Sequence, residues 1–317
     1  MADLGEDGVL ALILPRLPRG GSTLLGPGDD AAVLTAADGR TVVSTDVLVD
    51  GRHFRRAWST GTDVGHRAAM QNLADIAAMG ARPTALVVAL VCPLDLPVSW
   101  LLGLADGLAA ACGPRIGVVG GDLSAGEELA VSVTVLGDLD GAEPVLRSGA
   151  RVGDVVAHAG VRGRSAAGLD ALLAGRDEDL PEVVEGYRRP VCPIEAGPAA
   201  ARAGATAMLD VSDGLLRDAG RIARASGVTL DLDDPERSFL PDLAALAEAE
   251  RVLGGDARAW VLTGGEDHGL LATFPPGTDL PAPFRAVGRV VRVVEGTPVL
   301  VAGSPPHGAL GWDHFSR

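Results

Sequence analysis

The hydrophobic and polar positions of this chain follow two patterns in turn, one typical of strands and one typical of helices. Runs of β-branched and aliphatic residues predict strands in both halves of the sequence. Between them lie segments with apolar residues three and four positions apart, which predict amphipathic helices. We expect strands over residues 41–46, 85–91, 116–122, 129–137, 155–158, 206–210, 270–274 and 286–294. We expect helices over residues 8–17, 62–79, 99–111, 165–173, 196–203 and 214–226.

This alternation predicts an α/β chain of the α+β type. At 317 residues the chain is long for a single core, so we expect two domains. A turn-rich segment, residues 147–154, separates two halves that show the same α/β rhythm. We therefore predict one domain over residues 1–145 and a second over residues 146–317.

The predicted helix over residues 62–79 carries polar side chains where an apolar face is expected. Gln71 and Asp75 are four residues apart and share one face of the helix, and Asn72 lies beside them. Polar groups that face inward on a helix rich in Ala, Met and Leu contradict the local pattern. Such contradictions tend to mark functional sites.

Five segments place a carboxylate among small or turn-forming residues beside a hydrophobic run. Glycine lets a bulky polyanion approach the backbone, and aspartate has a short reach that suits a hard cation. Two carboxylates about 4 Å apart would repel by roughly 4 kcal/mol at an effective dielectric constant near 20, so a cluster of them needs metal ions. We therefore predict a site for several Mg²⁺ ions and a nucleoside triphosphate. The segments are residues 28–30, 44–46, 72–75, 120–122 and 210–214.

Each segment alone is an ordinary turn signal, and the prediction depends on their joint occurrence at the ends of predicted elements. We expect Asp46 at the carboxyl end of its strand and Asp122 in a turn that ends another strand. Ser212 or Asp213 is expected to cap the helix that starts at Gly214, which would form an anion site beside a metal ligand. For residues 264–267 a simple hairpin turn stays an open alternative.

Composition excludes several classes of protein. The net charge of −15 argues against a nucleic acid or an anionic membrane as partner, and the longest apolar run, residues 85–92, is too short to span a bilayer. All 27 basic residues are arginine, so the chain lacks the lysine that a P-loop or a protein-kinase fold places on the phosphates. The acidic N-terminus is unlike a secretory signal, and three scattered cysteines indicate reduced thiols in a cytoplasm.

Six histidines give neither a Ser/His/Asp triad nor a zinc-ligand spacing. His53 fits a surface position as well as a ligand position, and His158 fits a structural role within its predicted strand. Trp312 could cover a site or clamp a planar ring.

With these motifs in order, the chain resembles the thiamine-monophosphate kinases, within the wider aminoimidazole-ribonucleotide synthetase-like superfamily. The resemblance runs from Gly26 to Phe315, nearly the whole chain. The segments that carry it are GPGDDAAVL, VVSTDVLVDGRHF, HRAAMQNLADIAAMGARP, VVGGDLSAG, LRSGARVGD, LDVSDGLLRDAGRIA, LTGGEDHGLLATF and GWDHF.

The resemblance implies a two-domain synthetase-like fold, with an N-terminal mixed-sheet domain that pairs in a homodimer and a C-terminal α/β domain that closes the active-site cleft. It also implies direct transfer of the γ-phosphoryl group of ATP to thiamine monophosphate. For this metal-assisted reaction we expect no dedicated catalytic base, because the attacking group is already a phosphate oxygen. By motif match, Mg²⁺ would be held by Asp30, Ser44, Thr45, Asp46, Asp75, Asp122, Asp210 and Asp213. ATP would contact Gly121, Asp122, Arg147 and Ser212, and thiamine monophosphate would contact His53, Glu266 and Trp312.

The chain departs from this pattern at two places. Relatives usually carry an aromatic residue before the GGD segment, where this chain has Gly113, Pro114 and Arg115, so Arg115 is left to stack on the adenine. After GGED, relatives commonly have Tyr-Glu, whereas this chain has His268 and Gly269. We expect neither departure to touch the metal ligands.

Three alternative functions stay open beside the kinase. A synthetase that activates an amide or formyl group with ATP is disfavoured by His53 and by the terminal GWDHF segment. A selenium- or hydrogenase-maturation relative is less well matched, since the first cysteine is Cys92. A binder of nucleotide or thiamine phosphate without activity would not need so many metal carboxylates.

Overall fold

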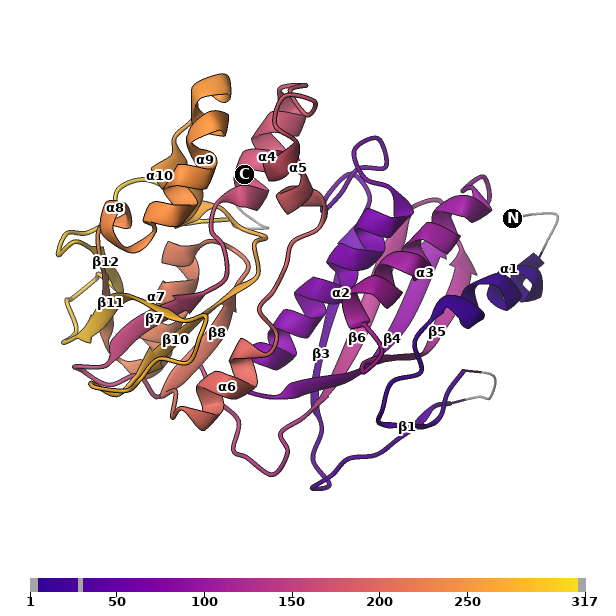
Figure 1. Cartoon of the computed structure of the whole chain (residues 1–317), viewed down its shortest axis with the longest axis horizontal. Coiled ribbons are helices and arrows are strands. Elements are labelled where there is room, and N and C mark those ends of the chain that lie inside the picture. Colours follow the sequence, from indigo (N-terminus) through magenta and orange to yellow (C-terminus); the bar gives the residue numbers. More distant parts are fainter. Residues whose placement is uncertain (1–4, 28–30, 313–317) are drawn as a thin grey trace. The chain divides into compact units, whose positions relative to one another are not determined.

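The computed structural model of the chain describes residues 5–27 and 31–312 (Figure 1). The chain divides into two compact units, of which unit 1 comprises Met1–Ile76 and Ala81–Ala142. Unit 2 comprises Ala77–Gly80 and Glu143–Arg317. The domain limits expected from the sequence, residues 1–145 and 146–317, stay a prediction.

Unit 1 is built on a four-stranded mixed sheet with the strand order β3-β6-β4-β5. The strands are β3 (Val42–Val49), β4 (Arg82–Cys92), β5 (Gly117–Ala125) and β6 (Ala130–Asp138). β6 runs antiparallel to both β3 and β4, while β4 and β5 are parallel. The unit also contains α1 (Gly5–Ile13), the 3₁₀ helix η1 (Leu14–Arg16) and the antiparallel pair β1 (Thr23–Leu25) and β2 (Val33–Leu34).

Two helices, α2 (Gly61–Ala78) and α3 (Val98–Cys112), lie side by side on one face of this sheet (Figure 1). Glycines allow the two helix backbones to approach closely. A Cβ atom on Gly65 would lie 2.1 Å from the carbonyl oxygen of Leu104, and one on Gly107 would lie 2.1 Å from that of Thr62. Both distances are far below van der Waals contact, so the helix pair depends on the absence of these side chains.

The other face of the sheet exposes a set of valines. Val43 and Val47 of β3 are 63% and 47% exposed, and Val87 and Val91 of β4 are also exposed. Successive residues of a strand point to opposite faces, so these valines lie on the face that α2 and α3 do not cover. We call this surface, defined by the four valines, the open face.

Unit 2 is built on a six-stranded sheet with the order β12-β9-β11-β7-β10-β8, antiparallel except for the parallel pair β12 and β9. All residues of β8 and β10 are buried, which explains why both strands are mainly apolar. Helix α7 packs against β8 and β9. The strands are β7 (Val155–Ala159), β8 (Ala207–Val211), β9 (Thr229–Leu232), β10 (Gly269–Phe274), β11 (Arg285–Val291) and β12 (Val299–Val301). The helices are α4 (Arg164–Leu173), α5 (Pro181–Arg188), α6 (Ala196–Arg202), α7 (Leu215–Ser226), α8 (Pro235–Ser238), α9 (Leu240–Leu253) and α10 (Ala257–Thr263).

Two of the strand boundaries that differ from the expectation concern carboxylates. β3 continues to Val49, so Asp46 lies within the strand rather than at its carboxyl end. β5 continues to Ala125, so Asp122 lies within a strand rather than in a turn. Pairing with the neighbouring strand extends each of them, because β3 is in register with β6 over its whole length and β5 follows β4. Local turn signals carry no information on such pairing.

None of the helices in the described part of the chain combines the length and the apolar character that crossing a bilayer requires.

Candidate active site

Ser44 and Asp75 form the best-defined polar contact among the expected metal ligands of unit 1. The Ser44 hydroxyl of β3 donates a 2.7 Å hydrogen bond to Oδ2 of Asp75 on α2. Asp46 lies two residues further along β3 and therefore on the same sheet face as Ser44. Of the polar residues singled out on α2, Asp75 thus faces the sheet, whereas the amide of the buried Asn72 donates to the carbonyl of Ala68 within its own helix.

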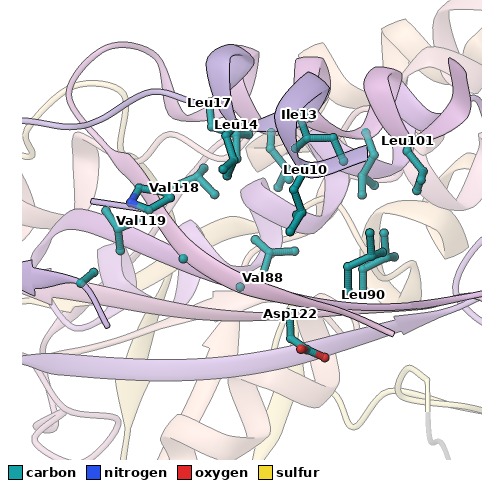
Figure 2. Close-up of a pocket in the computed structure, with 18 of the residues that line it drawn as sticks. Leu10, Ile13, Leu14, Leu17, Val88, Leu90, Leu101, Val118, Val119 and Asp122 are labelled. Carbon is teal, nitrogen blue, oxygen red and sulfur yellow. The ribbon is translucent and has the colours of Figure 1, made fainter. Parts of the chain in front are cut away.

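Thr45 and Asp122 belong to the opposite face of the same sheet. The Thr45 hydroxyl is hydrogen-bonded to the carbonyl of Val133 and to the hydroxyl of Thr134. Figure 2 shows the Asp122 carboxylate on the far side of the sheet from Val88 and Leu90. There it accepts a 2.8 Å hydrogen bond from the Ser124 hydroxyl.

Asp46 on β3 and Asp122 on β5 also lie far apart across the sheet, because β3 and β5 are its two edge strands. Three inter-strand spacings of about 4.8 Å place the two strands roughly 14 Å apart. Oxygen ligands of Mg²⁺ lie about 2.1 Å from the ion. The sheet of one chain therefore does not bring Asp46 and Asp122 to the same ion.

A cavity of about 330 Å³ lies on the α3 side of β4 and β5 (Figure 2). Its walls are mainly aliphatic and come from α1, η1, α3 and the two strands, with the backbone of Gly120 and Gly121 at one side. Asp122 belongs to its lining, but the carboxylate points away from it (Figure 2). The cavity offers an apolar surface, and no other charged side chain lines it in the described part of the chain.

His53 lies in the turn that follows β3. Its Nδ1 accepts a 3.0 Å hydrogen bond from the backbone N–H of Val49. Because Nδ1 acts as the acceptor, the neutral ring carries its proton on Nε2. The structure thus gives this histidine a defined orientation as well as partial burial.

In unit 2, three segments that are distant in sequence meet. The segment 210–214 comprises the last two residues of β8 and the three that follow it, the segment 264–268 precedes β10, and the third contains Gly311 and Trp312. The N–H of Glu266 donates to the carbonyl of Ser212, and the N–H of Trp312 donates to the carbonyl of Asp213, both at 2.8 Å. The structure therefore brings together five of the expected residues, namely Asp210, Ser212, Asp213, Glu266 and Trp312.

Glycines make this meeting possible. A Cβ atom on Gly265 would lie 2.5 Å from the carbonyl oxygen of Ser212, and one on Gly311 would lie 2.2 Å from that of Asp213. Residues 264–267 are consequently not the hairpin turn that the sequence left open, since they connect α10 to β10 while packing against the segment after β8.

Asp213 does not have the capping role that the sequence suggested. The N-cap of α7 is Gly214, and no side chain caps this helix, so the expectation for Ser212 or Asp213 is wrong. The Asp213 carboxylate instead pairs with Arg221 at 2.5 Å. Arg221 also binds Asp218, which is fully buried, and burial raises the pKa of Asp218 to about 6 even though Arg221 opposes this shift.

His268 lies between two of the expected ligands. Its Nδ1 is 3.6 Å from Oδ2 of Asp210, and its Nε2 is 3.7 Å from Oε2 of Glu266. Burial would lower the pKa of this imidazole, but the carboxylates of Asp210 and Glu266 outweigh burial and raise it to about 10. The expectation that the His268 departure leaves the metal ligands untouched is therefore wrong, because the ring pairs with Asp210.

A buried arginine, Arg162, anchors the segment 264–268 through contacts with two of its residues. Arg162 is fully buried; its guanidinium donates to the carbonyl of Gly264 and lies 3.5 Å from the Asp267 carboxylate. Asp267 also accepts hydrogen bonds from the N–H groups of Gly163 and Ser165. Sequence reasoning missed Arg162, because nothing near it in the chain marks a partner a hundred residues away.

One of the expected ligands, Arg147, stands apart from these clusters. The carbonyl of Arg147 accepts a hydrogen bond from Ser226 at the carboxyl end of α7, whereas Ser212 precedes the start of that helix. Twelve helical residues span about 18 Å, so the backbone of Arg147 lies well away from Ser212. Asp30 lies outside the described residues.

Comparison with known families identifies the chain. The model for the N-terminal domain of AIR synthase related proteins matches residues 28–139, and that for the C-terminal domain matches residues 151–269. The thiamine-monophosphate kinase of Mycobacterium tuberculosis is 48% identical over 100% of this chain and 93% of its own length. The chain belongs to the thiamine-monophosphate kinase family. The enzyme from Corynebacterium glutamicum is 42% identical over 99% of this chain and 95% of its own length.

Solved structures agree with this membership. The thiamine-monophosphate kinase of Aquifex aeolicus is 33% identical, with a TM-score of 0.75 over 84% of this chain and 89% of that one. The complex of AaThiL with AMPPCP and TMP has the same TM-score at 31% identity, over 99% and 98% of the two chains. The hydrogenase maturation protein HypE, at 20% identity and a TM-score of 0.70, shares the fold. The expected two-domain synthetase-like fold and the resemblance are thereby confirmed, and the chain is a phosphotransferase.

The donor atoms of this thiamine-monophosphate kinase family member suit magnesium. Asp46, Asp75, Asp122 and Asp210 offer carboxylate oxygens, and Ser44 offers a hydroxyl, which are the hard ligands that Mg²⁺ prefers. Among the described residues, no three His, Cys, Asp or Glu side chains are already gathered as a metal site. The Asp213 carboxylate, in contrast, is engaged by Arg221.

Proposed function

We propose that the protein transfers the γ-phosphoryl group of ATP directly and in line to thiamine monophosphate, forming thiamine diphosphate with the help of several Mg²⁺ ions. The observation that carries the proposal is the meeting of the segments 210–214, 264–268 and 311–312 in unit 2. This meeting supports the proposal, because it brings together Asp210, which we propose as a metal ligand, Ser212, which we propose for ATP, and the two residues that we propose for the acceptor, Glu266 and Trp312. The AaThiL complex with AMPPCP, an ATP analogue, and TMP supports both substrates.

The proposed assignment of ligands follows the chemistry of each side chain. Bound Mg²⁺ would neutralise and orient the polyphosphate. The residues that we propose to hold it are Asp30, Ser44, Thr45, Asp46, Asp75, Asp122, Asp210 and Asp213. Gly121, Asp122, Arg147 and Ser212 would contact ATP, and His53, Glu266 and Trp312 would contact thiamine monophosphate.

The proposed reaction needs no dedicated base. The attacking atom is a phosphate oxygen, which is mostly deprotonated near pH 7. The main obstacle is to bring two polyanions together in line, and positioning and charge neutralisation remove it. This explains how a chain without lysine can carry out phosphoryl transfer.

We also propose a homodimer in which the N-terminal sheets pair. The open face supports this proposal, because Val43, Val47, Val87 and Val91 leave an apolar sheet surface exposed in the single chain. The separation of Asp46 and Asp122 on opposite edges and faces supports it as well. In a dimer, Asp122 of one copy could reach the ion held by Asp46 of the other.

A cytoplasmic location remains our proposal, consistent with the buried cysteines at positions 92, 112 and 192, none of which forms a disulfide in the described structure.

The reaction can be tested by incubating the protein with ATP, Mg²⁺ and thiamine monophosphate and separating the thiamine compounds by chromatography. We expect thiamine diphosphate and ADP in equal amounts, and no product when free thiamine replaces the monophosphate. Formation of ADP without thiamine diphosphate, or phosphorylation of free thiamine, would contradict the proposal. Binding of both ligands without turnover would favour the non-catalytic alternative.

A further inference from the structure

We propose that Arg162 is a positioning residue that fixes the backbone of the segment 264–268, and thereby the place from which Glu266 contacts thiamine monophosphate. The inference rests on the proposed function for the role of Glu266. Arg162 lies in the loop between β7 and α4, 102 residues before Gly264 in the sequence. We assign it no contact with a substrate, so it acts through the segment that it holds.

The guanidinium of Arg162 holds the end of α10 and the start of the segment. This side chain is fully buried, and its Nε donates a 3.3 Å hydrogen bond to the carbonyl of Val261 while a second nitrogen donates to the carbonyl of Gly264. One guanidinium can bind both carbonyls because its donors form a planar fork. Hydrogen bonds from a buried cation are stronger than those between neutral groups, so Gly264 is fixed two residues before Glu266.

Asp267 fixes the backbone on the other side of Glu266. Its carboxylate accepts hydrogen bonds from the N–H groups of Gly163, at 2.6 Å, and Ser165, at 2.9 Å. Gly163 is the N-cap of α4 and has no side chain, so Asp267 supplies the acceptor that the first N–H groups of this helix need. The positive end of the helix and the guanidinium of Arg162, 3.5 Å away, both suit a carboxylate here.

The loop that carries Arg162 is itself anchored to other elements. Its backbone N–H donates a 2.8 Å hydrogen bond to Oδ1 of Asp242 on α9, and Oδ2 of Asp242 accepts from the guanidinium of Arg285 on β11. A Cβ atom on Gly163, which has φ +84°, would lie 2.8 Å from a methyl carbon of Leu246, so the loop packs tightly against α9. The position of Arg162 is therefore set by α9 and β11, independently of the segment 264–268.

Glu266 lies between the two fixed points and is less buried than either. Its backbone has φ +67°, and its N–H donates a 2.8 Å hydrogen bond to the carbonyl of Ser212. A residue other than glycine keeps such a left-handed conformation only where its surroundings enforce it. The side chain of Glu266 is 36% exposed, against 0% for Arg162 and 2% for Asp267. The buried pair thus fixes the backbone and leaves the Glu266 carboxylate accessible to a ligand.

Replacing Arg162 with lysine tests this role. The variant Arg162→Lys keeps a positive charge beside Asp267 but loses the planar fork, so it cannot bind both carbonyls in the same geometry. We expect the KM for thiamine monophosphate to rise about tenfold, with kcat and the KM for ATP within about twofold, because only the acceptor contact is displaced. Arg285→Lys is the matched control, since the guanidinium of Arg285 binds Asp242 and the carbonyl of Gly160. It should leave all three constants unchanged.

A second background distinguishes positioning of Glu266 from a general effect on the fold. In a Glu266→Ala protein, Arg162→Lys should change the KM for thiamine monophosphate by less than about twofold, because its effect passes through the side chain that is already absent. A tenfold rise in both backgrounds, or no rise in either, would overturn the proposal. If Arg162→Lys does not fold, Arg162→Met combined with Asp267→Asn takes its place, since removing both charges leaves neither buried and unpaired.

Hydrogen exchange of the ligand-free protein separates this inference from the proposed function. The hydrogen-bonded N–H groups of Glu266, Gly163 and Ser165 should exchange at least about tenfold faster in Arg162→Lys, and at the wild-type rate in Arg285→Lys. Faster exchange in a protein that forms no thiamine diphosphate would overturn the proposed function and support the positioning role. Unchanged exchange in Arg162→Lys would overturn the positioning role, whatever reaction the protein catalyses.

Discussion

The hydroxyl of Ser44 donates a 2.7 Å hydrogen bond to Oδ2 of Asp75, across 31 residues of sequence. This bond joins an edge strand of the unit 1 sheet to the last turns of α2. It places a hydroxyl and a carboxylate oxygen side by side, which is a pair of hard ligands on one side of the sheet. It also gives the Asp75 carboxylate a defined partner on the sheet.

Replacing Asp75 with asparagine should abolish turnover and leave the fold intact. The substitution removes a charge that we propose to hold Mg²⁺, and such charge stabilisation is worth several kcal/mol, so we expect a loss of about a thousandfold in kcat/KM. The midpoint of urea unfolding should change little, since the amide can still accept from Ser44. Ser44→Ala serves as the comparison and should cost much less. Near-wild-type turnover of Asp75→Asn would remove the metal assignment.

Mixing two inactive variants tests whether the site is shared between copies. Asp46→Asn and Asp122→Asn should each be inactive alone. If Asp46 of one copy and Asp122 of the other bind the same ion, co-refolding the two variants should restore up to about a quarter of the wild-type activity. About half of the dimers would then be mixed, and each mixed dimer would have one intact site out of two. Asp46→Asn co-refolded with Asp75→Asn is the control, since both residues lie on the same side of one sheet, and this mixture should recover no activity. Recovery in the control but not in the test mixture would contradict the shared site.

Gly65→Ala should destabilise unit 1 strongly. The new methyl group would meet the backbone of Leu104, which cannot move without separating α2 from α3. Overpacking of this kind typically costs about 1–3 kcal/mol, and we expect the upper part of that range. Gly103→Ala is the matched control on α3, because its Cβ would lie no closer than 3.1 Å to the Thr62 hydroxyl and 3.2 Å to the Thr62 backbone nitrogen, against 2.1 Å to a carbonyl oxygen for Gly65. Urea unfolding should show the control close to wild type, and equal losses in both variants would contradict the packing argument.

Acid should destabilise the protein partly through His158. This residue is fully buried next to the Phe239 ring, and burial, together with the charges of Arg162 and Arg285, lowers its pKa well below the ordinary value. Below about pH 6.5 the unfolded chain therefore binds a proton at His158 that the folded chain does not bind. The free energy of unfolding consequently falls as the pH decreases, by about 1.4 kcal/mol per pH unit for one proton.

His158→Leu should remove this contribution. Unfolding free energies measured between pH 7 and pH 5 should fall less steeply in the variant than in the wild type, by up to about one proton's slope. His307→Asn, which changes an exposed histidine, should leave the slope unchanged. An unchanged slope in His158→Leu would show that this histidine is protonated in the folded state.

The family, the reaction class and most of the regular elements could be read from the sequence. The apolar spacing over residues 62–79 predicted α2 to within one residue at each end, because a helix is stabilised by contacts three and four residues apart. The buried runs predicted β7, β8 and β10 for a similarly local reason. The order of the aspartate and glycine motifs was enough to identify the family, since each motif is a short contiguous segment.

The tertiary structure alone decided which of these residues meet. The sequence suggested that Asp46 and Asp122 end their strands, but strand pairing extends both strands and places the two carboxylates at opposite edges and on opposite faces. It offered no sign that His268 lies between Asp210 and Glu266, or that Arg162 holds Gly264. Strand register and loop packing depend on partners tens to hundreds of residues away, and local propensity contains no information on them.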